Sequence, residues 1–215
     1  MTMKKERVPG DEHRIVNLPR LEALGDAVFA FALTLLALDL RVPETAANAL
    51  AQGILSMLPK LLIFVFAFLV IAQEWDVHQR TMMHIAQADG VFVWLYLLSL
   101  MFVVLMPTSA DMLGRYPLQP LALIFFGVNT ALLCIASWGM WRYASHAGRL
   151  LSDDIKPSVV KLIERLWLYP PIVILLTMPL GFLSVYPVYA IWILLPVTSY
   201  TYSTWYFRKR QGKKA

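Results

Sequence analysis

The feature of this sequence that most constrains its fold is a series of long apolar runs without charged side chains. Residues 61–72 read LLIFVFAFLVIA, twelve consecutive positions that carry no polar side chain. A helix needs about 20 apolar residues to cross the roughly 30 Å hydrocarbon core of a membrane. Applied along the chain, this requirement predicts six membrane-spanning helices, at residues 21–40, 54–73, 91–111, 118–138, 166–185 and 187–207.

The composition agrees with a membrane environment. Hydrophobic residues make up 59% of the 215 residues and charged residues 15%, with a mean hydropathy of +0.60, whereas soluble domains carry about 25% charged residues. We therefore expect an all-α integral membrane protein, multi-pass in the cell membrane, in which residues 1–215 form a single domain. Residues 1–19 are polar and lack the apolar core of a cleavable signal peptide. The single cysteine, Cys134, lies in the fourth run, where a buried packing role is expected.

The distribution of lysine and arginine predicts the orientation, because cytoplasmic segments of membrane proteins are enriched in these residues. Only Arg41, Lys60 and Arg115 fall on one side of the six predicted helices. The other side carries the remaining 16 of the 19 basic residues: Lys4, Lys5, Arg7, Arg14, Arg20, Arg80, Arg142, Arg149, Lys156, Lys161, Arg165, Arg208, Lys209, Arg210, Lys213 and Lys214. We expect both termini in the cytoplasm, with residues 208–215 as a basic tail. The net charge of +5 is then a topology signal, and no nucleic-acid partner is expected.

The centres of the predicted helices contain no acidic, basic or histidine side chains. Proton-coupled transporters and pumps use such groups at bilayer depth, and hydrolases need an activated nucleophile or a metal. His78 and His84 are six residues apart and flank a short predicted cytoplasmic turn, which is a poor arrangement for a metal pair. We therefore expect no enzymatic activity, no metal site and no cofactor.

The polar residues gather instead at the ends of the first three predicted helices. Arg20 and Asp26 open the first helix, which continues through Thr34 to Val42 and Pro43. Trp75 and His78 follow the second helix, and Pro107 lies near the end of the third. This pattern resembles the transmembrane protein 175 family of potassium channels, in particular its single-repeat prokaryotic members. Their first helix carries an Arg-x-x-x-Phe-Ser-Asp signature. Here Leu24 stands where Phe is usual, and Gly25 where Ser is usual.

The resemblance implies a potassium-permeable cation channel of leak character, with moderate selectivity for potassium over sodium. In the family, four single-repeat chains surround a central pore that is lined by the first helix and narrowed by rings of bulky apolar side chains. Carried over to this chain, a homotetramer would place Phe31, Leu35 and Leu38 at the constriction, with Thr34 beside them. Arg20, Asp26, Trp75 and His78 would form a structural network, and the permeant ion would be potassium.

Helical geometry is compatible with that assignment. At about 100° per residue, Leu35 and Leu38 lie within about 40° of Phe31, whereas Asp26 lies about 140° away. Such a stripe is also common in ordinary packing, and Trp and Arg are common at membrane interfaces. Two other functions therefore stay open: a secondary transporter, with a midplane site at Pro170, Pro171, Pro179 and Pro196, and a non-transporting membrane scaffold.

Overall fold

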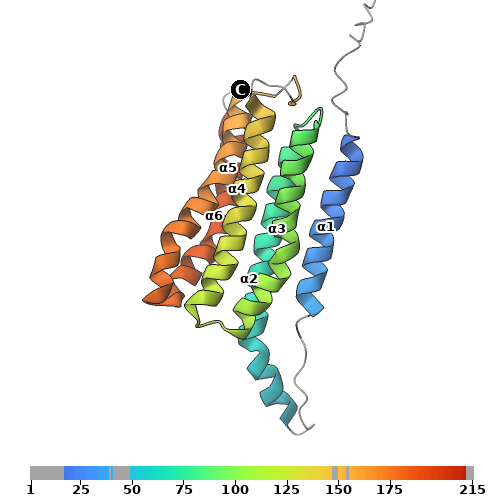
Figure 1. The fold of residues 1–215 in the computed structure, drawn as a ribbon. Helices are drawn as coiled ribbons and strands as arrows, with labels where there is room; N and C mark the ends of the chain where they lie inside the picture. The colour runs from blue at the N-terminus through green and yellow to red at the C-terminus, as the bar shows by residue number, and fades with distance from the viewer. Residues whose placement is uncertain (1–16, 39, 41–48, 147–149, 154, 212–215) are drawn as a thin grey trace, which may run out of the picture.

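The chain forms a bundle of long antiparallel α-helices in a computed structural model that describes residues 17–38, 40, 49–146, 150–153 and 155–211, without the side chains of residues 200 and 202–211 (Figure 1). The helices are α1 (Leu18–Leu38), α2 (Leu50–Met82), α3 (Gly90–Arg115), α4 (Pro120–Ser145), α5 (Pro157–Thr177) and α6 (Val185–Gln211), with a short 3₁₀-helix η3 (Met178–Phe182) before α6.

Local chemistry accounts for several helix boundaries. Asp89 caps α3, because its carboxylate accepts a hydrogen bond from the Phe92 N–H at 2.9 Å. Pro120 and Pro157 are the first residues of α4 and α5, where proline's missing N–H costs no helical hydrogen bond. These starts fix the short connections that return the chain after each pass.

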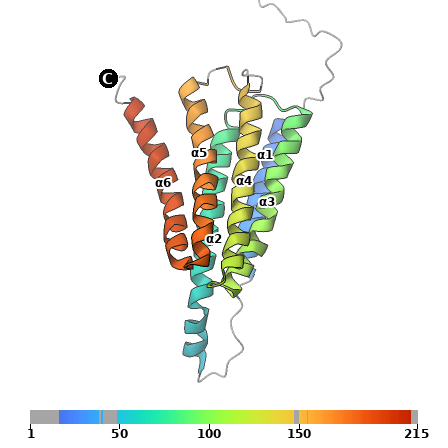
Figure 2. The same ribbon diagram turned by 60° about the vertical axis from the view of Figure 1, so that its left-hand side comes forward.

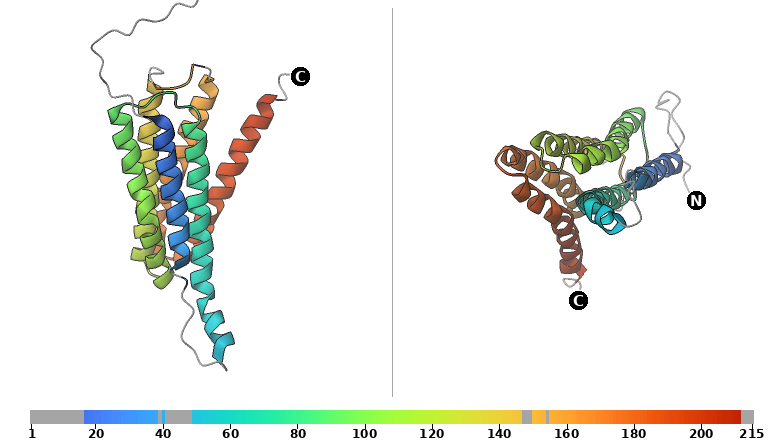
Figure 3. Two further views of the ribbon diagram at one scale, coloured as in Figure 1. Left: turned by 90° about the vertical axis from the view of Figure 1, so that its right-hand side faces the viewer. Right: turned by 90° about the horizontal axis from the view of Figure 1, so that it is seen from below.

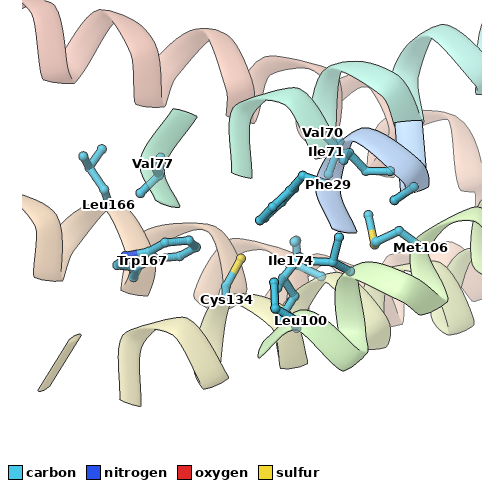
Figure 4. Packing of buried hydrophobic residues seen from close by; sticks show 14 of the residues in the cluster. Phe29, Val70, Ile71, Val77, Leu100, Met106, Cys134, Leu166, Trp167 and Ile174 are labelled. Atoms are coloured by element: carbon cyan, nitrogen blue, oxygen red, sulfur yellow. The ribbon is translucent and has the colours of Figure 1, made fainter. Parts of the chain in front are cut away.

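Helix α4 lies at the centre of the bundle and packs against α3 on one side and α5 on the other (Figure 2). Cys134, Met140 and Trp141 of α4 are fully buried. Figure 4 shows part of the apolar core, from Leu166 and Trp167 to Met106. Among the described elements, helix α1 contacts only α2 and α3 appreciably, so the described part of the chain leaves one of its faces uncovered (Figure 3). Helix α6 diverges from the bundle toward its C-terminal end (Figure 3).

Polar side chains tie the helices together inside this core. Trp167 of α5 donates its indole N–H to the Thr81 hydroxyl of α2 at 3.0 Å. The Asn129 amide of α4 donates to the Phe102 carbonyl of α3 at 3.2 Å. At the end of the bundle, where both side chains are half-buried, Tyr143 of α4 donates to Asp89 at 2.6 Å. Hydrogen bonds of this kind position membrane helices against one another, because no water competes for the groups.

Four of the described helices, α1 to α4, are long and apolar enough to cross a membrane, and α6 contains a shorter apolar segment, Val185–Ser199. The prediction of helical membrane segments is therefore confirmed for the first four runs. Helix α5 begins nine residues earlier than the fifth predicted run and ends in η3, within the predicted span.

The predicted end of the second helix at residue 73 is wrong, because α2 continues to Met82 and is 33 residues long. His78 therefore lies inside a helix, not at a cytoplasmic turn. The cause of the difference is that residues 74–80 are mostly polar and interrupt the apolar run, yet they keep helical backbone, and Glu74, Val77 and His78 among them are buried. At its other end, the first turns of α2 extend beyond the rest of the bundle (Figure 3).

Candidate functional site

Helix α1 has two distinct faces. Leu21, Gly25, Phe29, Ala32 and Leu36 recur at intervals of three or four residues and are all buried against α2 and α3. This spacing is that of a single helical face. The opposite face of α1 touches no part of the described chain that would bury it.

The residues predicted to form the constriction lie on that uncovered face. The side chains of Phe31 and Leu38 are 64% and 69% exposed, and Leu35 between them is half-buried. Thr34 is exposed at the edge of the stripe, and its hydroxyl donates to the Phe31 carbonyl at 2.8 Å. Because its proton is used within the helix, the Thr34 oxygen can present only lone pairs outward.

Asp26 connects α1 to α2. Its carboxylate accepts hydrogen bonds from the Trp75 indole N–H at 3.0 Å and from the Gln79 amide. Trp75 and Gln79 are four residues apart, so they lie on one face of α2. Asp26 and Trp75 both stay exposed in the single chain. The structure thus brings these two predicted residues together, at the boundary between the buried and the uncovered face of α1.

His78 belongs to a separate, buried cluster beneath this pair. The Tyr96 hydroxyl of α3 donates to the Leu21 carbonyl at 3.0 Å and lies 3.2 Å from His78 Nε2. The His78 ring packs between the rings of Phe29 and Tyr96, each with a centroid distance of 5.3 Å. One hydroxyl therefore joins α1, α2 and α3 at a single point.

Gly25 makes this contact possible. A Cβ atom at position 25 would lie 1.9 Å from the Tyr96 hydroxyl and 3.1 Å from His78 Nε2. The serine that is usual at this position of the family signature would therefore collide with Tyr96. Glycine in place of the usual serine therefore has a physical reason. The Tyr96 hydroxyl of α3 occupies the space on α1 that a serine side chain would fill.

The other signature residues make fewer contacts with neighbouring helices in the single chain. Arg20 is exposed on the first turn of α1, and no side-chain hydrogen bond or ion pair of Arg20 is seen within the described residues. Leu24 is 43% exposed and lies on the uncovered side of α1. Val42 and Pro43 lie outside the described residues.

Sequence reasoning missed Gln79, Tyr96 and Glu74. Gln79 could have been found, because the spacing of Trp75, His78 and Gln79 is that of one helical face. Tyr96 had no local signal, since it meets α1 from 75 residues away. Glu74 directly follows the second predicted helix and is polar by residue type, but its side chain is only 4% exposed inside the bundle.

Comparisons with known proteins agree with this architecture. The family model described as "Endosomal/lysosomal potassium channel TMEM175" matches residues 20–107. A potassium channel of Chamaesiphon minutus is 30% identical over 174 residues, covering 78% of this chain and 85% of that protein. A potassium channel of Streptomyces collinus is 29% identical over 141 residues, covering 63% of this chain and 68% of that protein.

The fold agrees as well. The crystal structure of a lysosomal potassium-selective channel TMEM175 homolog from Chamaesiphon minutus superposes with a TM-score of 0.74 at 26% identity, covering 86% of this chain and 97% of that chain. The family match begins at Arg20, runs through the α1–α2–α3 contacts and ends at Pro107. The chain belongs to the TMEM175 family.

Proposed function

We propose that this chain is the subunit of a potassium-permeable leak channel, in which four copies surround a pore lined by the uncovered face of α1. The observation that carries the proposal is the contrast between the two faces of α1: Phe29, Ala32 and Leu36 are at most 4% exposed, whereas Phe31 and Leu38 are more than 60% exposed. Relatives that share this fold are potassium channels, which favours a pore over a lipid contact for that face.

The pore would be gated by the wetting of an apolar neck. Rings of Phe31, Leu35 and Leu38 offer no groups that replace the hydration shell of an ion, so a narrow neck would be dry and would conduct only when widened. Moderate selectivity for potassium would follow from the lower cost of partially dehydrating the larger ion. The outward lone pairs of Thr34 would assist at the edge of the neck.

Six membrane crossings with both termini in the cytoplasm fit the position of the charges in the bundle. Arg20, Arg80 and Lys156 lie near the end where α1 begins and α2 finishes, whereas Lys60 and Arg115 lie near the opposite end, around Asp111. The positive-inside rule makes the first end cytoplasmic. The cell membrane is the proposed location.

The secondary-transporter alternative requires helices broken near the midplane. Helix α5 runs without interruption through Pro170 and Pro171, and α6 through Pro196. The described backbone therefore shows no break at Pro170, Pro171 or Pro196, whereas Pro179 lies in η3, just after the α-helical geometry of α5 ends.

The test of the proposed function is an ion flux assay on purified protein in liposomes, with potassium and sodium gradients compared in matched vesicles. We expect potassium flux well above that of empty vesicles, and a smaller sodium flux. Protein that elutes as a homogeneous oligomer and carries neither ion would overturn the proposal and leave the scaffold reading.

A further inference from the structure

Glu74 is an acidic side chain that is buried among α2, α4, α5 and α6, away from the uncovered face of α1. It lies on α2, and its Oε1 atom accepts a hydrogen bond from the Cys134 thiol of α4 at 3.4 Å. Its Oε2 atom is buried and has no hydrogen-bond partner among the described residues. Each described ion pair joins other residues, so no basic side chain is seen to neutralise Glu74.

Beside Glu74 is a cavity of about 20 Å³ between α2, α4, α5 and α6. A cavity of at least roughly 10–15 Å³ can hold one water molecule if polar groups surround it. The polar side chains that line it besides Glu74 are Gln73 and Thr130. The remaining lining is apolar and includes Ile174, which Figure 4 shows in the same buried cluster as Cys134.

The backbone of α6 offers a further hydrogen-bond acceptor for a water, because a proline interrupts its hydrogen bonding. Pro196 has no N–H, so it cannot bond the carbonyl of Trp192 one helical turn before it. Trp192 and Pro196 both line the cavity. In membrane helices, ordered water is one means of satisfying carbonyl groups that proline leaves unpaired.

The neighbours of Glu74 do not favour a charge. Facing the carboxyl, α4 presents the Cys134 thiol and Thr130, α5 presents Pro170 and Ile174, and α6 presents Trp192 and Leu195. On α2 itself, His78 lies one turn away but is engaged with Tyr96 of α3. Burying an unpaired carboxylate costs several kcal/mol, whereas a neutral carboxyl has an O–H that needs an acceptor.

We propose that Glu74 and the adjoining cavity form a binding site for one proton and one water molecule, in which the protonated carboxyl donates to the water and the water donates to the Trp192 carbonyl. The site lies within the subunit and not on the proposed pore face, so it goes beyond the proposed channel function. Through the Cys134 thiol, the Glu74 carboxyl and the water, it would link α4 and α2 to α6, and the carboxyl would donate to the water only while it keeps its proton.

The test is infrared spectroscopy of the purified protein in liposomes at neutral pH, where exposed glutamates are ionised. The protonated carboxyl should give a C=O stretching band separate from the carboxylate bands, and Glu74→Gln should abolish it. Glu164→Gln is the matched control, because Glu164 pairs with Arg142 at 3.7 Å and should leave the band unchanged.

Cys134→Ser keeps Glu74 but changes the donor to Oε1, so it should shift the band without removing it. This variant keeps the proposal testable if Glu74→Gln does not fold. A folded wild-type protein without such a band, or a band that neither Glu74→Gln nor Cys134→Ser alters, would overturn the proposal. For the water, a cryo-electron microscopy map that resolves ordered waters should show one density peak in this cavity, and an empty cavity there would contradict that part of the proposal.

Discussion

Replacing Gly25 by alanine tests the close approach of α1 and α3. Ordinarily, alanine stabilises a helix by roughly 0.5–1 kcal/mol relative to glycine. At position 25 the new Cβ would lie 1.9 Å from the Tyr96 hydroxyl, so this oxygen must retreat by about 1.5 Å to reach the ordinary contact distance of 3.4 Å. That movement breaks its hydrogen bonds to the Leu21 carbonyl and to His78.

A buried polar group left without its partner costs about 1–3 kcal/mol. Two such losses of about 1–3 kcal/mol each, less the helix-propensity gain of about 0.5–1 kcal/mol, predict that Gly25→Ala lowers the free energy of unfolding by about 1–5 kcal/mol. The assay is denaturant unfolding of the protein in detergent micelles, followed by tryptophan fluorescence. The matched control is Gly139→Ala in α4, because a Cβ there meets nothing within 4 Å; this variant should be neutral or more stable.

A double mutant tests whether the Tyr96 hydroxyl is the group that collides with the new Cβ. Tyr96→Phe removes the colliding oxygen, and the nearest remaining ring atom is 3.1 Å from the new Cβ, a distance that a small shift relieves. Gly25→Ala combined with Tyr96→Phe should therefore be less destabilised than the sum of the two single variants, by about 1–2 kcal/mol. Equal stability of Gly25→Ala and the wild type, or strict additivity, would refute the claim that Tyr96 occupies this space.

Three further predictions concern other parts of the chain. Asp26→Ala removes the acceptor for Trp75 and Gln79, so it should lower the yield of oligomer on a sizing column while leaving the potassium-to-sodium ratio of the surviving oligomer unchanged; a well-assembled variant with an altered ratio would instead place Asp26 on the permeation path. Trp167→Phe removes the donor to Thr81 and should lower unfolding free energy by about 1–3 kcal/mol, whereas Trp94→Phe, at a residue 75% exposed, should change it little; equal effects would disprove the role of that hydrogen bond. Reporter domains fused at Gly10 and Lys214 should both report a cytoplasmic location, and an external signal from either would contradict the proposed topology.

The helices could be predicted from the sequence where hydropathy alone sets them. Runs such as residues 61–72 are too apolar to be exposed to water and indicate a membrane. The first four predicted helices overlap α1 to α4. The end of α2 could not be predicted in this way. Glu74 and His78 are polar by residue type but buried in the fold, and hydropathy assigns a polar side chain to the surface unless its partners are known.

The candidate site shows the same division. The two faces of α1 follow from helical spacing, so the uncovered position of Phe31 and Leu38 agrees with the predicted stripe. The contact of Tyr96 with Gly25 depends on how α3 packs on α1, and the local sequence pattern of neither helix predicts that packing. In the proposed tetramer the stripe would face other copies of the chain, and neither helical spacing nor hydropathy specifies that contact.

The most direct test of the account measures potassium and sodium flux through liposomes that contain Phe31→Asn. A polar ring at this position should wet the apolar neck, because dry constrictions depend on their apolar walls. The control is Leu176→Asn on α5, the same kind of substitution at an apolar residue that is 74% exposed but lies off the proposed pore. The account predicts that Phe31→Asn raises basal flux and lowers the preference for potassium, while Leu176→Asn does neither; a normally assembled Phe31→Asn channel that conducts like the wild type would contradict it.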